Sequence, residues 1–517
     1  MAKKEQLLWA DDEIDLLRPH ILFLKEKGYE VTTVVSGQDA IDVCRNNHFD
    51  IIFLDENMPG LTGLETLNFI KEITPTTPVV MITKSEEESI MEQAIGSRIA
   101  DYLIKPVNPN QIILSIKKLL HKDNIVSEAN TSGYRQEYSA IAMMMQEAET
   151  PEDWEELYHR LTYWQVELSE TQSDLISLLD VQRKEANSLF SRFIERNYQS
   201  WVNAPADERP LISPDFISRR VFPLLNQGDK VCFVLLDNLR FDQWLALKPL
   251  LDPYFTIQEE IAYSILPSVT QFSRNSIFAG LMPLQIQKMF PDLWVGEEDE
   301  EHRKNLYEEE LLASQLQRYR KSYTFNYHKV LESAFGERLL QQFNNSTSAQ
   351  LNVFVVNFVD MLSHARTESK MIRELISSEA AYRSLTVSWF RHNFILDLFR
   401  QMAEAGFKIV LATDHGSVHV TNPVKVVGDR ETTTNLRYKQ GRRLSYNPKQ
   451  VFAVTNPHAY GLPTPNLSTS YIFATGDDFL SYPNNYNHYV KYYKGTFQHG
   501  GVSMEEMMLP LVTLTPK

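Results

Sequence analysis

VCFVLLD, at residues 231–237, is an apolar run with the length of a buried β-strand, and it ends on an acid. Two further runs share this design, NVFVVNFVD at 352–360 and IVLATDHG at 409–416. Short continuous apolar runs are typical of strands buried on both faces, as in the parallel sheet of an α/β fold. Because the carboxyl ends of parallel strands meet at one edge of the sheet, we expect the acids that follow the three runs to lie close together.

The segments around these runs contain aspartates and histidines. These residue types bind the pairs of metal ions that act on phosphate esters. The segment LPSVTQFSRNSIFAG at 266–280 adds a hydroxyl that a metal ion could activate, and the glycine-bounded HGG loop at 499–501 adds an imidazole. Each motif alone is weak, since a single His is more often a satisfied core residue. The prediction of a two-metal site depends on the whole set, which is Asp237, Thr270, Asp360, His364, Asp414, His415 and His499.

Composition limits the classes of protein to which the chain can belong. Its 517 residues are too many for one hydrophobic core and predict about three domains. The formal net charge of -16 argues against sequence-independent binding of duplex DNA. Cys44 and Cys232 lie in apolar segments and predict buried thiols in a reducing compartment. No signal-peptide pattern is present and no run reaches the ~18 apolar residues of a membrane span, so we expect a soluble, cytoplasmic protein.

The pattern of apolar residues predicts an α/β protein of three domains. Residues 1–122 alternate β-rich and amphipathic stretches, which predicts a doubly wound parallel sheet of five strands. From 123 to 212 the β signal disappears and apolar residues recur at three- and four-residue steps, which predicts a helical bundle that joins its neighbours. Residues 213–517 are predicted to form a second, larger α/β domain. Within it, the acidic run at 297–310 is interpreted as a solvated helix or insertion.

The strand ends of the first domain carry carboxylates, a hydroxyl and an amine. Asp11 and Asp12 follow the first predicted strand, Asp55 ends the third, Thr83 the fourth and Lys105 the fifth. These groups are expected to converge at one sheet edge, where carboxylates suit Mg²⁺, which also bridges phosphate oxygens. The lysine supplies a positive charge for a phosphoryl group. Asp55 is then the predicted phosphate acceptor.

This pattern resembles the receiver domains of two-component response regulators over about the first 120 residues. Pro59 and Gly60 after the acceptor, and Tyr102 three positions before Lys105, agree with that family. The resemblance implies phosphorylation by a sensor histidine kinase and a phosphorylation-dependent homodimer that pairs through the face containing Tyr102. The implied Mg²⁺ ligands are Asp11, Asp12 and Asp55, and the implied switch residues are Thr83, Tyr102 and Lys105.

The order of motifs in the last domain, over about residues 225–515, resembles the alkaline phosphatase superfamily and, within it, the PglZ branch. That resemblance implies two Zn²⁺ ions and a covalent phosphothreonine formed on Thr270. It divides the ligands into two groups. Asp237, Thr270, Asp414 and His415 would bind one zinc ion, and Asp360, His364 and His499 would bind the other.

The ligand pattern leaves the substrate open among monoesters, diesters, phosphonates and related esters. Arg274 and Asn238 are candidates for donating to phosphate oxygens, or are ordinary helix and loop residues. The basic stretch 429–447, with Tyr438 and Tyr446 interleaved, suits charge and stacking contacts with single-stranded or cyclic nucleotides, or is a solvated loop. We expect a phosphodiesterase or phosphatase, and favour cyclic or linear oligonucleotides as its substrate.

Taken together, the receiver, helical segment and PglZ-like domain resemble the response regulators of type IX protein secretion. The resemblance implies a sigma factor and the cytoplasmic part of a secretion-motor membrane protein as partners, with no direct membrane insertion. The alternative function is a non-enzymatic signalling adaptor that uses the hydrolase-like domain as a docking surface. The complete set of ligands with Thr270 favours an enzyme, because a scaffold has no need of a nucleophile. A DNA-binding output is disfavoured, because no short basic recognition-helix module follows the receiver.

Overall fold

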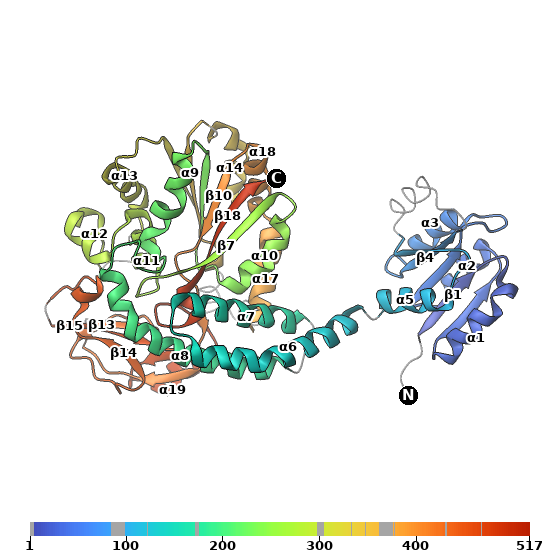
Figure 1. The fold of residues 1–517 in the computed structure, drawn as a ribbon, viewed down its shortest axis with the longest axis horizontal. Coiled ribbons are helices and arrows are strands. Elements are labelled where there is room, and N and C mark those ends of the chain that lie inside the picture. Colours follow the sequence, from blue (N-terminus) through green and yellow to red (C-terminus); the bar gives the residue numbers. More distant parts are fainter. Residues whose placement is uncertain are drawn as a thin grey trace. The chain divides into compact units, whose positions relative to one another are not determined.

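The chain divides into two compact units, Met1–Asn130 and Thr131–Lys517 (Figure 1). No helix that the structure describes is long and apolar enough to cross a membrane. His364 lies outside the described residues. This computed structural model describes residues 5–83, 99–120, 122–170, 175–296, 304–331, 333–346, 348–360, 376, 378–429, 432–466 and 468–517.

A five-stranded parallel sheet in the order β2-β1-β3-β4-β5 forms the centre of the first unit. Alternate residues of β1 enter two different cores, with Leu7 and Trp9 on one face and Leu8 and Ala10 on the other. The predicted doubly wound sheet is confirmed. Its strands are β1 (Gln6–Ala10), β2 (Glu30–Val34), β3 (Ile51–Asp55), β4 (Val79–Thr83) and β5 (Asp101–Ile104), and its described helices are α1 (Arg18–Glu26), α2 (Gly37–Asn46), α3 (Gly63–Ile73) and α5 (Pro109–Leu120).

Helix α3 begins close to the end of β3 because its first turn is capped and its first residue is small. Thr62 Oγ1 accepts a hydrogen bond from the Glu65 backbone N–H, and the Glu65 carboxylate accepts one from the Thr62 N–H. A Cβ atom at Gly63 would lie 2.3 Å from the carbonyl oxygen of Asp55. Glycine at position 63 therefore lets this helix start against the strand end that carries Asp55.

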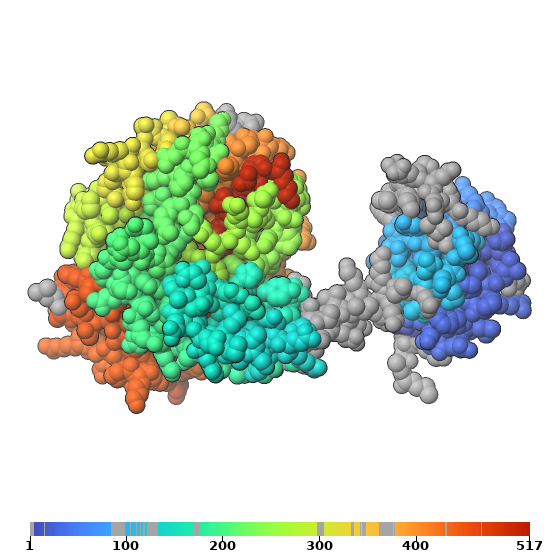
Figure 2. Space-filling model, viewed as in Figure 1, coloured from blue at the N-terminus to red at the C-terminus, as the bar shows by residue number. Residues whose placement is uncertain are grey.

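Three helices follow the first sheet, and we call them the helical segment: α6 (Lys122–Glu147), α7 (Pro151–Glu170) and α8 (Ile176–Asn203). In the second unit, α7 and α8 share a hydrophobic core with the large sheet of that unit. Figure 2 shows the surface of these helices, in teal and green, directly against the rest of that unit. Trp154 of α7 packs against Phe190 of α8 with ring centroids 5.4 Å apart, and Trp201 of α8 lies 5.2 Å from Tyr263 of β7 (Phe255–Tyr263).

The sheet of the second unit has the strand order β7-β18-β10-β6-β9-β8. Four neighbouring strands are parallel, and β18 (Met508–Pro516) is antiparallel to both β10 and β7. The sheet is therefore mixed, and the predicted α/β fold is confirmed. The parallel strands are β10 (Lys408–Ala412), β6 (Val231–Leu236), β9 (Leu351–Val356) and β8 (Phe325–Val330).

Both faces of this sheet are covered, which explains why its central strands are apolar throughout. Within β6, Cys232 and Val234 join a core with α10, α17 and α18, whereas Phe233 and Leu235 join a core with α11 and α13. The covering helices are α10 (Phe241–Leu251), α17 (Glu379–His392), α18 (Phe394–Glu404), α11 (Thr270–Ala279) and α13 (Glu308–Arg318).

The second unit also contains smaller sheets outside the six-stranded sheet. The three-stranded sheet β13-β15-β14 contains Tyr438–Arg442, Thr469–Ala474 and Val451–Val454. The basic stretch 429–447 runs into β13, and there the structure corrects the sequence-based interpretation: Arg437, Tyr438 and Lys439 are buried. These three side chains therefore do not form an exposed nucleotide-binding surface. Further elements of the second unit are β11 (Val418–His419), β17 (Phe497–Gln498), β12 (Asn422–Lys425), β16 (Asp478–Ser481), α9 (Phe222–Asn226), α12 (Pro283–Met289), α14 (Ser333–Ser346), α19 (Tyr486–Tyr493) and α20 (Met504–Met507).

Candidate metal centre

Neighbouring parallel strands of the second sheet bring three distant acids to one edge. Asp237 directly follows β6, while Asp414 follows β10 and Asp360 follows β9, the strands that flank β6 on either side. This is the carboxyl edge, where α/β folds place their functional groups. As predicted, the three acids that follow the apolar runs lie close together.

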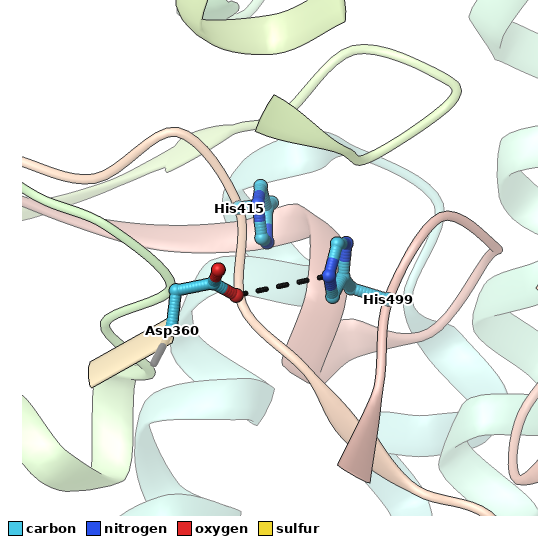
Figure 3. Close-up of side chains that lie close together, drawn as sticks. All are labelled: Asp360, His415 and His499. Carbon is cyan, nitrogen blue, oxygen red and sulfur yellow. Dashed lines mark ion pairs between the residues drawn. The ribbon is translucent and has the colours of Figure 1, made fainter. Parts of the chain in front are cut away.

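The acids and imidazoles form two overlapping groups. One ligand atom each from Asp237, Asp414 and His415 lie within 4.8 Å of one another, and the same is true of Asp360, His415 and His499. The rings of His415 and His499 stack with centroids 4.2 Å apart, and His499 Nε2 lies 3.8 Å from Asp360 Oδ1 (Figure 3). His415 thus belongs to both groups, whereas the resemblance assigned it to one.

Thr270, the predicted nucleophile, is the first residue of α11. Its Oγ1 lies 3.1 Å from His415 Nε2. The other ring nitrogen of His415, Nδ1, lies 3.1 Å from the carbonyl oxygen of Gly416 and carries the proton for that hydrogen bond. Nε2 therefore faces Thr270 and the carboxylate of Asp237.

Arg274 lies one helical turn after Thr270 and is fully buried. It pairs with Asp237, and its Nε donates to Asp414 Oδ2 at 2.9 Å. The sequence-based suggestion that Arg274 binds the phosphate is not supported in this structure, because its guanidinium is engaged with these two carboxylates.

Burial and Arg274 have opposite effects on the pKa of each carboxylate, and the net shift differs between Asp237 and Asp414. Burial raises the pKa of Asp237 well above its ordinary range, and Arg274 offsets this only in part. Burial also acts to raise the pKa of Asp414, but Arg274 and His415 outweigh it, and the pKa lies below its ordinary value. Of the two carboxylates, Asp414 is therefore the one held as the anion.

Glu308, at the start of α13, is a third partner of Arg274, with 3.4 Å between Oε1 and a guanidinium nitrogen. Tyr327 and Lys329 donate to the other carboxylate oxygen of Glu308, each at 2.6 Å. The acidic run at 297–310 was interpreted as solvated, and for Glu308 this is wrong, since it is 1 % exposed. Residues 297–303 lie outside the described part of the chain.

Asn238 links the two groups of ligands. Its backbone has a positive φ of 61°, in the left-handed region that asparagine tolerates better than most residues. Its N–H donates to Asp414 Oδ1 at 3.3 Å, and its side-chain amide donates to Asp360 Oδ1 at 3.2 Å. Asn238 therefore orients carboxylates of both groups, which sequence reasoning did not predict.

The predicted phosphate-acceptor site lies at the carboxyl edge of the first sheet. Ligand oxygens of Asp11, Asp12 and Asp55 lie within 4.8 Å of one another. Lys105 Nζ is 2.6 Å from Asp55 Oδ1 and 2.9 Å from Asp11 Oδ2. Burial raises the pKa of Asp55 above its ordinary value, with Lys105 opposing. The amine thus stands beside the acceptor carboxylate.

The two predicted switch residues next to this site differ in exposure. The Thr83 hydroxyl is buried and donates to the Glu56 carboxylate. The Tyr102 side chain is 43 % exposed.

Three known families match the chain in the order in which the structure presents its parts. The response regulator receiver domain matches residues 7–117, the PorX response regulator linker domain 124–202, and the BREX system PglZ alkaline phosphatase-like domain 216–514. The last match covers more than half of the 517 residues. The chain belongs to the PglZ family. It joins the PglZ domain to a receiver domain and a linker in the order of a PorX-like response regulator.

Characterised relatives share the receiver domain. The transcriptional regulatory protein ResD of Bacillus subtilis is 31% identical over 131 residues, which are 25% of this chain and 54% of ResD. SrrA of Staphylococcus aureus is 28% identical over 117 residues, 23% of this chain and 48% of SrrA. The chain thus spans about half the length of the curated relatives it matches. The receiver domain implies phosphorylation by a sensor histidine kinase.

Solved structures match the same part of the chain. The chemotaxis protein CheY4 of Vibrio cholerae is 27% identical, with a TM-score of 0.22, and the match covers 23% of this chain and all of CheY4. A two-component response regulator from Clostridium difficile is 29% identical, with a TM-score of 0.22, over 23% of this chain and 97% of that one.

Alkaline phosphatase-like domains usually bind metals, and the donor set of the PglZ domain fits zinc. It consists of carboxylates and imidazoles, which are zinc ligands in hydrolases. Asp237 Oδ1 is buried and accepts no hydrogen bond from the residues that the structure describes, so a metal ion would satisfy it. His415 is oriented by the Gly416 carbonyl, as ligating imidazoles usually are.

Proposed function

We propose that phosphorylation of Asp55 controls a zinc-dependent phosphodiesterase in the PglZ domain, which cleaves cyclic or linear oligonucleotides. The observation that carries this proposal is the place of Thr270, whose hydroxyl lies 3.1 Å from the imidazole shared by both ligand groups. A hydroxyl in that position can attack a phosphorus atom held between the two groups.

Zinc bound in these groups would polarise the phosphoryl oxygens and lower the pKa of the attacking hydroxyl. Asp237, Asp414 and His415 would hold one ion, and Asp360 and His499, with His415 beside them, would hold the other. His364 is also proposed as a ligand of the second ion.

The residues of the chain then have distinct tasks in the reaction. The Thr270 hydroxyl loses its proton as its oxygen attacks the phosphorus atom, and the P–O bond to the leaving ester oxygen breaks while that oxygen takes up a proton. Water then cleaves the resulting phosphothreonine, which restores the Thr270 hydroxyl and releases the phosphate product. Thr270 lies at the positive end of the α11 helix dipole, which favours an anionic phosphate there. Arg274 and Asn238 keep Asp237, Asp414 and Asp360 in place through the contacts described above.

Two features of the PglZ domain support a nucleotide-type substrate. A cavity of about 140 Å³ begins beside Thr270, at Gln271 and Phe272, and Trp294, Gln440 and Tyr471 also line it. Aromatic rings and side-chain amides are the groups with which proteins stack on and hydrogen-bond to nucleobases. The Oε1 atom of Gln440 is buried without a partner among the described residues, so a base N–H could satisfy it.

The second feature is α19, which precedes the His499 loop. His488 stacks on Tyr492 and Tyr489 on Tyr493, with ring centroids 6.5 and 6.2 Å apart. Residues 479–504 contain lysines and no acid, in a chain whose net charge is -16. A basic, aromatic helix suits a single-stranded nucleic acid, through stacking and phosphate contacts.

The receiver is proposed to act through a phosphorylation-dependent homodimer. A phosphoryl group adds about -1.5 to -2 charges and new acceptor oxygens beside Lys105. These oxygens compete with Glu56 for the Thr83 hydroxyl, and Tyr102 is proposed to follow Thr83 inward. Mg²⁺ held by Asp11, Asp12 and Asp55 is part of this proposal.

The cellular role proposed here is regulation of type IX secretion from the cytoplasm, with a sigma factor and a secretion-motor membrane protein as partners. The match to the PorX linker domain supports it.

A substrate screen tests the enzymatic function. The full-length, zinc-loaded protein is offered cyclic dinucleotides, linear oligonucleotides and simple phosphomonoesters, and we expect cleavage of the nucleotide diesters. Gln440→Leu and Tyr489→Ala should raise KM for the oligonucleotides while leaving a small aryl phosphate ester unaffected. Absence of hydrolysis of every ester by protein with bound zinc would contradict the proposal and favour the adaptor function.

A further inference from the structure

Helix α8 carries a buried polar stripe. Arg183, Asn187 and Ser191 are spaced four residues apart, so they lie on one face of the helix. Their exposed fractions are 9, 6 and 7 %. Polar side chains in such positions need specific partners, since an unsatisfied buried polar group is costly.

All three residues of the stripe contact the segment Val502–Glu505, which directly follows the His499-Gly500-Gly501 loop. Asn187 accepts a hydrogen bond from the Met504 N–H at 2.8 Å and donates to Glu505 Oε2 at 2.9 Å. Arg183 donates to Glu505 Oε1 at 2.7 Å, and the Ser191 hydroxyl donates to the Val502 carbonyl at 3.4 Å. The helical segment thus holds the chain three to six residues after a candidate zinc ligand.

The held segment supports the His415 loop as well. The Gly416 N–H donates to the Glu506 carbonyl at 3.1 Å. A Cβ atom at position 416 would lie 2.0 Å from the Glu505 carbonyl oxygen, so the residue after His415 packs directly on this segment. Glu506 Oε1 also accepts from the Gly501 N–H at 2.9 Å. Loops of both imidazoles therefore rest on the segment that α8 holds.

Arg183 extends the connection to a third place in the PglZ domain. It donates to Glu379 Oε2, at the start of α17, at 2.7 Å. Arg240 also contacts Glu379, at 3.5 Å, and lies three residues after Asp237. Removing one member of such a buried ionic network leaves its partners uncompensated, so the network favours one arrangement of its loops.

We propose that Arg183, Asn187 and Ser191 are positioning residues, through which the helical segment sets the geometry of the loops carrying His415 and His499. The inference concerns regulation of the proposed metal centre, and in that respect rests on the proposed function. A displacement of α8 changes the spacing of the two imidazoles without any contact to the substrate. The helical segment, which follows the receiver in the chain, thereby helps to hold the loops of the metal centre in place.

Hydrogen–deuterium exchange on the metal-free, full-length protein tests the inference. Asn187→Leu should speed amide exchange in residues 500–506 by about tenfold, because it removes the acceptor of the Met504 N–H and one donor to Glu505. The matched control is Gln182→Leu on the same helix. Gln182 is also buried, but it bonds Tyr134 and Tyr138 of α6 and not the loops.

A second readout is zinc retention against a chelator, which should fall by about tenfold in Asn187→Leu and stay near wild type in Gln182→Leu. Asn187→Ala serves if the leucine variant does not fold. Equal exchange of residues 500–506 in the folded Asn187 and Gln182 variants would overturn the inference. The exchange experiment needs neither zinc nor turnover, so a failure of the proposed hydrolase function leaves its outcome readable.

Discussion

Nε2 of His415 lies 3.1 Å from the hydroxyl oxygen of Thr270, and its ring stacks at 4.2 Å on that of His499. The imidazole of His415 therefore contacts the candidate nucleophile and also belongs to both ligand groups. The two groups therefore form one centre, because a substitution at His415 removes a ligand from each of them.

The shared position of His415 predicts an asymmetry between two histidine variants. His415→Ala should reduce bound zinc to well below one ion per chain, because it removes a ligand from both groups. His499→Ala should retain about one ion, because Asp237, Asp414 and His415 remain. Metal analysis of purified, chelator-free protein measures both. Equal losses in the two variants would mean that His415 is not shared.

The contacts of Arg274 predict that bound zinc affects the free energy of unfolding. Arg274→Met removes the cation that Asp237 and Asp414 share in the buried centre, and we expect about 3–5 kcal/mol lower stability of the metal-free protein. Added zinc should recover much of that loss, since the ion supplies positive charge to the same carboxylates. Urea denaturation with and without zinc checks this. A loss of stability that zinc does not reduce would separate Arg274 from the metal centre.

Glu155 predicts a pH dependence outside the metal centre. Burial, with Glu152 and Glu260 nearby, raises its pKa from 4.5 to about 7. The stabilising contribution of the protonated form is fully present below the ordinary pKa and is lost as the pH rises through about 7. Relative to Glu155→Gln, wild type should therefore lose stability between about pH 4.5 and pH 7. Denaturation across this range tests it, with exposed Glu156→Gln as the control, which should run parallel to wild type.

Phosphorylation of Asp55 is expected to promote dimerisation. Light scattering with Mg²⁺ and a beryllofluoride phosphate mimic should show a doubled mass for wild type and no change for Asp55→Ala. Tyr102→Ala should weaken the dimer without preventing binding of the mimic, because Tyr102 is exposed and is not one of the proposed Mg²⁺ ligands. If wild type and Asp55→Ala have equal masses in both conditions, phosphorylation does not drive association.

Much of the fold could be predicted from local patterns. Strands β6 and β9 are buried on both faces, and this burial produces the continuous apolar runs that predicted them. The antiparallel pairing of β18 with both β10 and β7 could not be predicted, because strand order is a tertiary property that periodicity does not encode.

The candidate site was predictable in its residue types and less so in its contacts. Asp237 and Asp414 follow parallel strands, whose carboxyl ends meet at one edge of the sheet. Their proximity could therefore be predicted. The burial of Glu308, Glu505 and Arg437 was not predictable, because a charged residue in a polar stretch gives no sign of a distant buried partner. The ion pair of Arg437 with Glu506 joins residues 69 positions apart. Such pairs can be recognised only when the fold brings the segments together.

The central claim is that Thr270 performs the attack at a metal centre that other residues hold. The most direct test compares Thr270→Ala with wild type in the rate of nucleotide diester hydrolysis, with bound zinc measured on the same samples. We expect the variant to keep most of its zinc and to lose at least about a thousandfold in rate, since the hydroxyl supplies the attack. Turnover equal to wild type in zinc-loaded Thr270→Ala would contradict the account and point to water as the nucleophile.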